Sequence, residues 1–297
     1  MPRLIPISFG SRPYPMGISP ALDELPGHFD RRPFQTKRAY CLHTEYSAGP
    51  RQWNSPLLRG LDEITSSQRK GIPELWPNHK WGEQFAEFII RLVGENQDPT
   101  IVEIHPPFAS YCKDVDSLLD GYAVFASSLR SRFPRSIIVI ENRNGTRHPS
   151  KFLVSTVGDV VTLFAAVERR GIDLGLALDL PQIFSAHLGS KPPTPPEVEY
   201  LLEKLRPVAH RIETLHIWGR RKTAHNGTLD DLFGHDPLAK ETFFDGLHRL
   251  LEDGRPRYFL PEVNSSKEDL QTIVSDFIEA GFIFVNSIIN KDNSIHR

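Results

Sequence analysis

Acidic and histidine side chains stand at the ends of several apolar segments of this chain. In the clearest case, four β-branched residues at positions 137–140 run directly into Glu141. Carboxylates and imidazoles that share one cavity are suitable ligands for a divalent cation such as Zn, Mn, Mg or Co. Six residues of these types follow apolar segments: His43, His105, Glu141, Asp179, His216 and Glu262. The sequence therefore predicts a metal site, provided that the ends of these segments converge.

Two chemistries are compatible with these ligands. One ion held by Glu141, Asp179, His216 and Glu262 would act as a Lewis acid on a carbonyl or hydroxyl group. A neighbouring carbon-bound proton then becomes removable, and Glu141 or Glu262 would be the catalytic base, so the reaction would be an isomerisation or epimerisation. Alternatively, His43 and His105 would hold a second ion that shares Glu141, as in two-metal phosphodiester hydrolysis.

Other residues near the predicted strand ends are candidates for binding the substrate. We include Gln182, Trp218, Lys222, His225 and Arg143 in this group. Aromatic rings pack well against the C–H faces of a sugar, and Phe9, Tyr46, Phe184 and Trp218 are the candidates for such a wall. The basic run at 220–222 would bind a phosphate or a carboxylate of the substrate. The expected substrate is therefore a small carbohydrate-like molecule.

The elements that must position these residues alternate along the chain. Apolar runs predict strands at 3–9, 39–43, 101–105, 137–141, 174–179, 212–218, 257–263 and 282–285. Apolar residues at helical spacing, together with capping residues, predict helices at 79–93, 114–132, 155–170, 195–209, 237–252 and 266–280. Parallel strands that alternate with helices carry their functional residues at the carboxyl ends of the strands.

Eight predicted strands favour a closed (β/α)8 TIM barrel in the α/β class. An open doubly wound sheet usually carries a glycine-rich phosphate loop, and neither common form of that motif occurs here. We expect residues 1–297 to form one domain. The segments 10–38 and 47–78 are rich in Pro and Arg, and they are predicted to be long loops over the mouth of the barrel.

At these residues the sequence resembles the xylose isomerase-like TIM barrel superfamily, which includes sugar isomerases and epimerases and endonuclease IV. The resemblance rests on Glu141 in Ile-Glu-Asn-Arg-Asn-Gly145, on Asp179 in Leu-Asp-Leu-Pro-Gln182, on His216 in Leu-His-Ile-Trp218, and on Glu262 in Pro-Glu-Val-Asn264. It implies a shared metal ion on this quartet. The endonuclease IV pattern adds His43 in His-Thr-Glu-Tyr46 and His105 in His-Pro-Pro, which implies a second ion.

The chain departs from both branches at defined positions. Gln182 stands where both expect a histidine, and Thr223 replaces an aspartate of the endonuclease IV pattern two residues before His225. Two of the three ligands of that family's third ion are thereby absent. Lys222 stands where the epimerases have an arginine, which removes the bidentate fork of the guanidinium. A catalytically silent barrel that binds a metal or a ligand is therefore a further alternative.

Composition narrows the class of partner. The formal net charge of −2 gives no overall basic field for nucleic acid, so nucleic acid is the less favoured partner. Two cysteines do not make a disulfide framework, and we expect reduced thiols in a cytoplasmic protein. No apolar run is long enough to span a membrane, so no membrane partner is expected. A homo-oligomer is compatible with the sequence.

Overall fold

The computed structural model describes residues 1–11, 13–47, 49–144 and 151–285. Within this part of the chain, eight parallel strands pair side by side and close into a ring through the pairing of β10 with β1. In the order of the ring they are β1 (Arg3–Ser8), β2 (Leu22–Gly27), β3 (Tyr40–Thr44), β6 (Ile101–Ile104), β7 (Ile137–Glu141), β8 (Gly175–Asp179), β9 (Ile212–Ile217) and β10 (Arg257–Pro261). The closed barrel predicted from the alternating pattern is confirmed.

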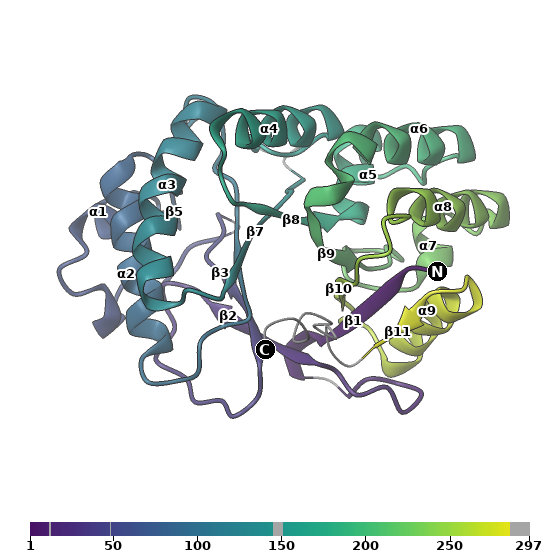
Figure 1. Cartoon of the computed structure of the whole chain (residues 1–297), viewed down its shortest axis with the longest axis horizontal. Helices are drawn as coiled ribbons and strands as arrows, with labels where there is room; N and C mark the ends of the chain where they lie inside the picture. Colours follow the sequence, from purple (N-terminus) through teal and green to yellow (C-terminus); the bar gives the residue numbers. More distant parts are fainter. Residues whose placement is uncertain (12, 48, 145–150, 286–297) are drawn as a thin grey trace, which may run out of the picture.

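Helices surround most of this ring (Figure 1). The longer ones are α2 (His79–Val93), α3 (Val115–Arg132), α4 (Val157–Arg170), α5 (Leu180–Leu188), α6 (Pro195–Leu205), α8 (Pro237–Leu250) and α9 (Lys267–Glu279). All six predicted helices are present, and only α6 ends clearly early, where a 3-10 helix at Arg206–Arg211 continues the chain. Helix α5 was not predicted, because it follows β8 without an intervening loop.

The strand count is right, but one member of the ring was assigned wrongly. The segment 10–38 contains β2, whose sequence Leu-Asp-Glu-Leu-Pro-Gly mixes acids, Pro and Gly, all residues depleted in strands. Its position between β1 and β3 compensates for this weak propensity. The last predicted strand, at 282–285, is present only as the two-residue strand β11 (Ile283–Phe284). It pairs with the start of β1 and is not needed to close the ring.

The first third of the barrel lacks the regular pattern of strand and helix. Among the described residues, no helix longer than one turn separates β1 from β2 or β2 from β3, and the lower edge of the ring in Figure 1 is covered by chain without helices. The segment 47–78 is not one long loop, because it contains the short helix α1 (Asp62–Ser66) and the hairpin of β4 (Gln68–Arg69) and β5 (Ile72–Pro73). Helix α1 packs against α2 at the side of the barrel.

Two apolar cores hold the barrel together. The smaller one fills the ring with inward side chains such as Ile7, Cys41, Val139 and Leu260. The larger one lies between the strands and the surrounding helices. Because side chains alternate along a strand, every second residue belongs to the inner core. Continuing that alternation to the carboxyl ends of the strands brings the predicted ligands onto one inward face.

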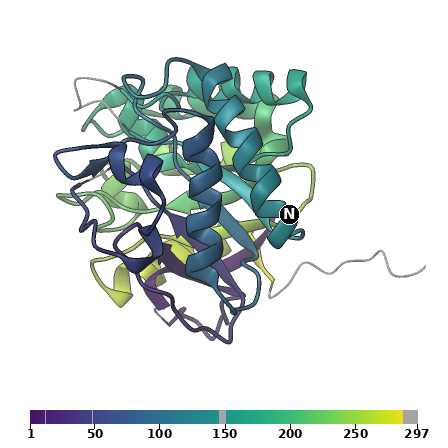
Figure 2. The same cartoon turned by 90° about the vertical axis from the view of Figure 1, so that its left-hand side faces the viewer.

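Two helices of the outer layer approach each other closely. Figure 2 shows α2 and α3 side by side on the face that lies at the left of Figure 1. A Cβ atom built on Gly82 of α2 would lie 2.4 Å from the backbone oxygen of Gly121 in α3. Glycine at position 82 is therefore what allows the two backbones to meet.

Among the described residues, no helix is both long and apolar enough to cross a membrane.

Candidate metal centre

The carboxyl ends of four neighbouring strands bring the predicted quartet together. Glu141 ends β7, Asp179 ends β8, His216 lies in β9, and Glu262 directly follows β10. The ligand atoms of Glu141, Asp179 and His216 lie within 4.8 Å of one another. Nδ1 of His216 is 3.5 Å from Oε1 of Glu262 and 3.9 Å from Oε1 of Glu141. All four side chains are buried.

Asn142 joins the ends of two of these strands. Its side-chain amide donates to the carbonyl oxygen of Asp179 at 2.9 Å and accepts from the backbone N–H of Asp179 at the same distance. This reciprocal pair fixes the backbone of β8 relative to β7 at the point where both ligands leave the strands. The Glu-Asn dipeptide of the sequence motif therefore supplies a candidate ligand and its support. Gly145 of the same motif lies outside the described residues.

Gln182 lies between two of the carboxylates. Its Nε2 is 2.8 Å from Oε1 of Glu141 and 2.8 Å from Oδ2 of Asp179, while its Oε1 accepts from the backbone N–H of Asn144. The indole N–H of Trp218 also donates to Oδ2 of Asp179, at 3.0 Å. The residue that replaces the expected histidine thus holds the quartet by hydrogen bonds, and it does not line the hollow at the barrel mouth described below.

His43 and His105 lie beside Glu141, where the two-metal interpretation requires them. Nε2 of His105 is 2.8 Å from Oε2 of Glu141, and the two imidazole rings are stacked with centroids 4.7 Å apart. Nδ1 of His105 lies 3.0 Å from the carbonyl oxygen of Glu45. If this nitrogen carries the proton, Nε2 is left with a lone pair that points into the site. The indole of Trp76 donates to the carbonyl oxygen of His105 and supports it from outside.

Two carboxylates of the site were not identified from the sequence. Glu24 of β2 lies 2.6 Å from Nδ1 of His43 through its Oε1, and Glu103 of β6 lies among the rings of His43, His105 and His216. Glu24 was missed because β2 was taken for a loop. Glu103 precedes His105 by two residues, so the period of a strand places both on the same face. That spacing was the available signal.

The electrostatics of the site follow from its burial. Burial, with the nearby Glu141 and Glu262, raises the pKa of Asp179 to about 8. Burial alone would lower the pKa of His43, but Glu103 and Glu24 outweigh it and raise that pKa to about 9. In the same way, burial opposes ionisation of Glu141, while Arg143 and His105 hold the pKa of this carboxyl well below its usual range. These shifts show that the site favours positive charge.

The residues of the site fit a bound divalent cation. Among the described residues, several buried atoms lack a hydrogen-bond partner: both carboxylate oxygens of Glu103, both ring nitrogens of His216, Nε2 of His43 and Nε2 of His105. The short contacts between some of them lie outside hydrogen-bonding geometry. Buried polar atoms normally find partners, and metal ligands are an exception because the ion itself is the partner. Carboxylates mixed with imidazoles suit Zn or Mn.

A hollow of about 370 Å³ opens above this centre at the barrel mouth. Glu262, His43, Glu24, Arg143 and His225 line it, and the aromatic wall consists of Phe9, Tyr46 and His28. Nδ1 of His225 is 3.3 Å from Oε2 of Glu262, and its ring lies 4.7 Å from that of Trp218. Two residues of the predicted substrate group, Arg143 and His225, therefore line the hollow and can touch a ligand there. Glu262 is the member of the metal quartet that also lines it.

The loop after β9 holds His225 over the hollow. Gly219 and Gly227 approach so closely that a Cβ atom on Gly219 would lie 2.2 Å from the carbonyl carbon of Gly227. Between them the chain turns back on itself, with a bridge from Arg220 to Asn226. His225 has a φ of 59° within this turn. The close approach of these two glycines thus positions the side chain of His225, and the histidine in the sequence gives no sign of this constraint.

Other candidates for the substrate group lie elsewhere. Lys222 is exposed and does not line the hollow. Its neighbours in the basic run bind the protein: Arg220 donates to Ser185 and Gly189, and Arg221 pairs with Asp231 and Asp269. Phe184 was wrongly expected in a sugar-binding wall, because it packs against Phe233 and Phe243 in the outer core. Helix α5 directs it away from the mouth.

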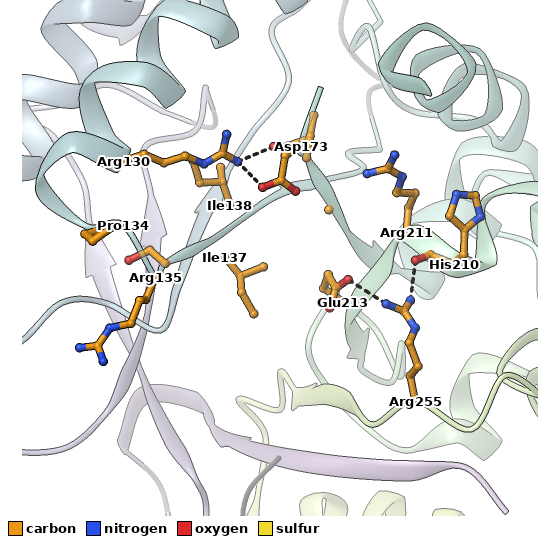
Figure 3. Close-up of a pocket in the computed structure, with 13 residues that line it drawn as sticks. Arg130, Pro134, Arg135, Ile137, Ile138, Asp173, His210, Arg211, Glu213 and Arg255 are labelled. Carbon is orange, nitrogen blue, oxygen red and sulfur yellow. Dashed lines mark hydrogen bonds and ion pairs between the residues drawn. The ribbon is translucent and has the colours of Figure 1, made fainter. Parts of the chain in front are cut away.

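A second hollow, of about 440 Å³, lies at the opposite end of the barrel, where β7, β8 and β9 begin (Figure 3). Three of its four lining arginines, Arg130, Arg211 and Arg255, are already paired with acids. Arg130 is 2.8 Å from Asp173, and Arg255 is 3.5 Å from Glu213. Residues at this end of a TIM barrel usually serve stability, whereas chemistry takes place at the carboxyl ends of the strands. The metal centre and the smaller hollow at the mouth are therefore the candidate functional site.

Comparisons with known proteins support the fold. No protein-family pattern and no curated protein matches the sequence. Among solved structures, the AP endonuclease, family 2 from Brucella melitensis has a TM-score of 0.50 at 12% identity, over 94% of this chain and 99% of that chain. The xylose isomerase domain protein from Planctomyces limnophilus has a TM-score of 0.41 at 11% identity, over 81% and 75%. The probable 3-DHS dehydratase AsbF from Bacillus anthracis has a TM-score of 0.40 at 10% identity, over 80% and 75%. At these identities the likeness shows the fold alone, and the match to the AP endonuclease structure agrees with the TIM barrel found here.

Proposed function

We propose that this protein is a divalent-metal-dependent enzyme that isomerises or epimerises a small carbohydrate-like substrate by proton transfer. The observation that carries the proposal is the double position of Glu262. This carboxylate lies against the quartet, 3.5 Å from His216, and it also lines the hollow at the barrel mouth. A ligand in the hollow therefore touches a carboxylate of the metal centre.

Glu262 is better placed than Glu141 to act as the base. Burial raises the pKa of Glu262, but His225 and His216 outweigh burial and lower it, so the carboxylate is ionised at neutral pH, as a base must be. Glu141 does not line the hollow, and its oxygens already face Gln182, His105 and Arg143. We therefore assign the proton transfer to Glu262, which also binds the metal, whereas Glu141 binds the metal alone.

The remaining residues of the hollow suit a small polar substrate. A volume of about 370 Å³ lies at the lower end of the range of small-molecule sites. The rings of Phe9 and Tyr46 provide apolar faces, and Arg143 and His225 provide donors for hydroxyl or carbonyl oxygens. A divalent ion on Glu141, Asp179, His216 and Glu262 would polarise the carbonyl or hydroxyl group from which the reaction starts.

A specific observation favours the second candidate, metal-dependent phosphodiester hydrolysis. His43, Glu103, His105 and Glu141 form another group whose ligand atoms lie within 4.8 Å of one another. It shares Glu141 with the quartet, which is the arrangement of a paired-metal clamp on a phosphate. The two candidates therefore differ in the reaction they predict at the same barrel mouth.

One pair of assays distinguishes the two candidates. Metal-stripped protein is reloaded with Mn²⁺ or Zn²⁺ and incubated in D₂O with a panel of aldoses, ketoses and their phosphates. We expect NMR to show exchange of a carbon-bound hydrogen next to a carbonyl group, and we expect this exchange to be lost in Glu262→Gln. Cleavage of a duplex that contains an abasic site, without any such exchange, would overturn the proposal in favour of hydrolysis. Bound metal with neither activity would favour the catalytically silent barrel.

A further inference from the structure

Glu103 lies one layer deeper in the barrel than the strand-end ligands. It belongs to β6, two residues before His105, so both side chains point inward. Its side chain is fully buried, and it does not line the hollow at the mouth. It is thus out of reach of a substrate, yet it lies directly beneath the histidines of the site.

The carboxylate of Glu103 is surrounded by imidazoles. Its oxygens lie 3.1 Å from Nε2 of His216, 3.7 Å from Nδ1 of His43 and 4.0 Å from Nε2 of His105. No described donor reaches either oxygen with hydrogen-bonding geometry. A fully buried carboxylate without donors is strongly destabilising unless a cation neutralises it. The environment of Glu103 therefore requires positive charge.

The charge of the whole centre points to more than one divalent ion. Five carboxylates contribute to it, namely Glu24, Glu103, Glu141, Asp179 and Glu262, and one guanidinium, that of Arg143, contacts the group at Glu141. Metal-bound histidines are neutral and metal-bound carboxylates are ionised, so a metal-loaded site has an excess of about four negative charges, which two divalent cations would balance. One ion on the quartet accounts for only half of this charge.

We propose that Glu103 is a ligand of a second divalent cation, which it binds together with His43, His105 and Glu141. These side chains supply four ligand atoms from three neighbouring strands, all within 4.8 Å of one another. Four protein ligands complete a tetrahedral shell, which is the arrangement of structural rather than catalytic sites. The ion is therefore closed to substrate, and it neutralises and rigidifies the floor beneath the reactive centre.

Glu24 has a different part in this arrangement. Its Oε1 accepts from Nδ1 of His43 at 2.6 Å, which leaves Nε2 of His43 as the nitrogen without a hydrogen-bond partner in the described structure. A carboxylate on one ring nitrogen fixes the tautomer and directs the other nitrogen to the metal. Glu24 is thus a positioning residue for His43, whereas Glu103 contacts the ion.

The inference rests on the proposed metal dependence but not on the proposed reaction, and its test counts ions. The full-length chain is stripped with a chelator and titrated with Zn²⁺ or Mn²⁺, and native mass spectrometry counts the ions bound. We expect two ions for wild type, one for Glu103→Gln and one for Glu262→Gln. Glu213→Gln is the matched control, because it makes the same change beside the far hollow and should leave two ions.

Thermal unfolding provides a second measurement that a merely structural role would not reproduce. Without metal, Glu103→Gln should unfold at the same temperature as wild type or a higher one, because it removes an uncompensated buried charge. With saturating Zn²⁺ the order should reverse, because the variant has lost one ion. If Glu103→Gln does not fold, Glu103→Asp keeps the charge on a shorter side chain, and it should weaken one of the two ions at least about tenfold.

The outcomes separate the two proposals. If wild type and Glu103→Gln bind the same number of ions with the same affinity, Glu103 is only a counter-ion of His216, and the inference is wrong while the proposed metal-dependent function stands. If wild type binds no Zn²⁺ or Mn²⁺, both proposals are wrong. A single ion in wild type that survives Glu103→Gln but not Glu262→Gln also overturns the Glu103 inference and leaves the quartet intact.

Discussion

At the scale of single residues, the amide of Gln182 holds two carboxylates of the site in place, at a position where a histidine was expected from the sequence. Its NH₂ group has two hydrogens, and it lies 2.8 Å from one oxygen of Glu141 and 2.8 Å from one oxygen of Asp179. Each buried carboxylate thereby gains one donor, and their separation is fixed. An amide adds no charge and is a poor ligand for a transition metal. Gln182 therefore fixes the geometry of the quartet without being suited to bind a metal itself.

Gln182→Leu tests this supporting part. It removes both donors while keeping a side chain of similar volume, so two buried carboxylates each lose a hydrogen bond. We expect the free energy of unfolding of the metal-free protein to fall by about 2–3 kcal/mol, measured by urea denaturation. Gln97→Leu, at an exposed site, is the control and should stay within about 0.5 kcal/mol of wild type. A similar small change in Gln182→Leu would show that the amide is dispensable.

At the scale of elements, the contact between α2 and α3 determines how the left side of the barrel in Figure 1 is covered. Glycine normally weakens a helix, because it loses more backbone entropy on folding than other residues. In α2 the weakness is offset, because the missing side chain lets the backbone of Gly82 meet that of Gly121. Gly158 near the start of α4 offers a contrast, since a Cβ atom there meets only Thr156 at 3.8 Å.

Two alanine substitutions separate these effects. Gly82→Ala should lower the free energy of unfolding by about 1–3 kcal/mol, because the added methyl group forces α2 and α3 apart. Gly158→Ala makes the same chemical change where there is room, and it should raise stability by about 0.4–1 kcal/mol. Chemical denaturation of both variants measures the change in the free energy of unfolding, which should be negative for Gly82→Ala and positive for Gly158→Ala. Equal stabilisation by both would mean that the helices can separate without loss.

At the scale of the whole molecule, the barrel concentrates its negative charge at one end. Buried carboxylates collect at the mouth, whereas arginines line the hollow at the far end, where three of the four pair with acids. Charges that are not balanced within the chain destabilise the folded state until a cation binds. The folded barrel is therefore expected to be stabilised by a bound cation.

Removal of metal should lower the thermal stability of the entire barrel. A ligand at a hundredfold excess over its dissociation constant stabilises the native state by about 2.7 kcal/mol. For a domain of this size the shift in Tm is roughly 5 °C or more, measured by calorimetry before and after chelation. The double variant Glu141→Gln/Glu262→Gln should show no shift on adding Zn²⁺. A shift as large as that of wild type would place the stabilising ion elsewhere.

The sequence by itself determined the closed barrel, seven of its eight ring strands (all except β2), and the six strand-end residues that gather at the barrel mouth. It could do so because parallel strands read as apolar runs and end at a common edge of the sheet. Among the residues proposed for binding substrate, Arg143 and His225 line the hollow, whereas Lys222 does not.

Only the tertiary structure revealed β2 with Glu24, the depth of Glu103, and the placement of His225 by two glycines. A strand rich in acids, Pro and Gly has no local signal, and it forms because the gap between β1 and β3 must be filled to close the ring. Glu103 resembles any residue of a buried strand until the neighbouring strands bring three histidines around it. Pairing across the barrel, which depends on closure and not on sequence neighbours, decides which side chains share a site.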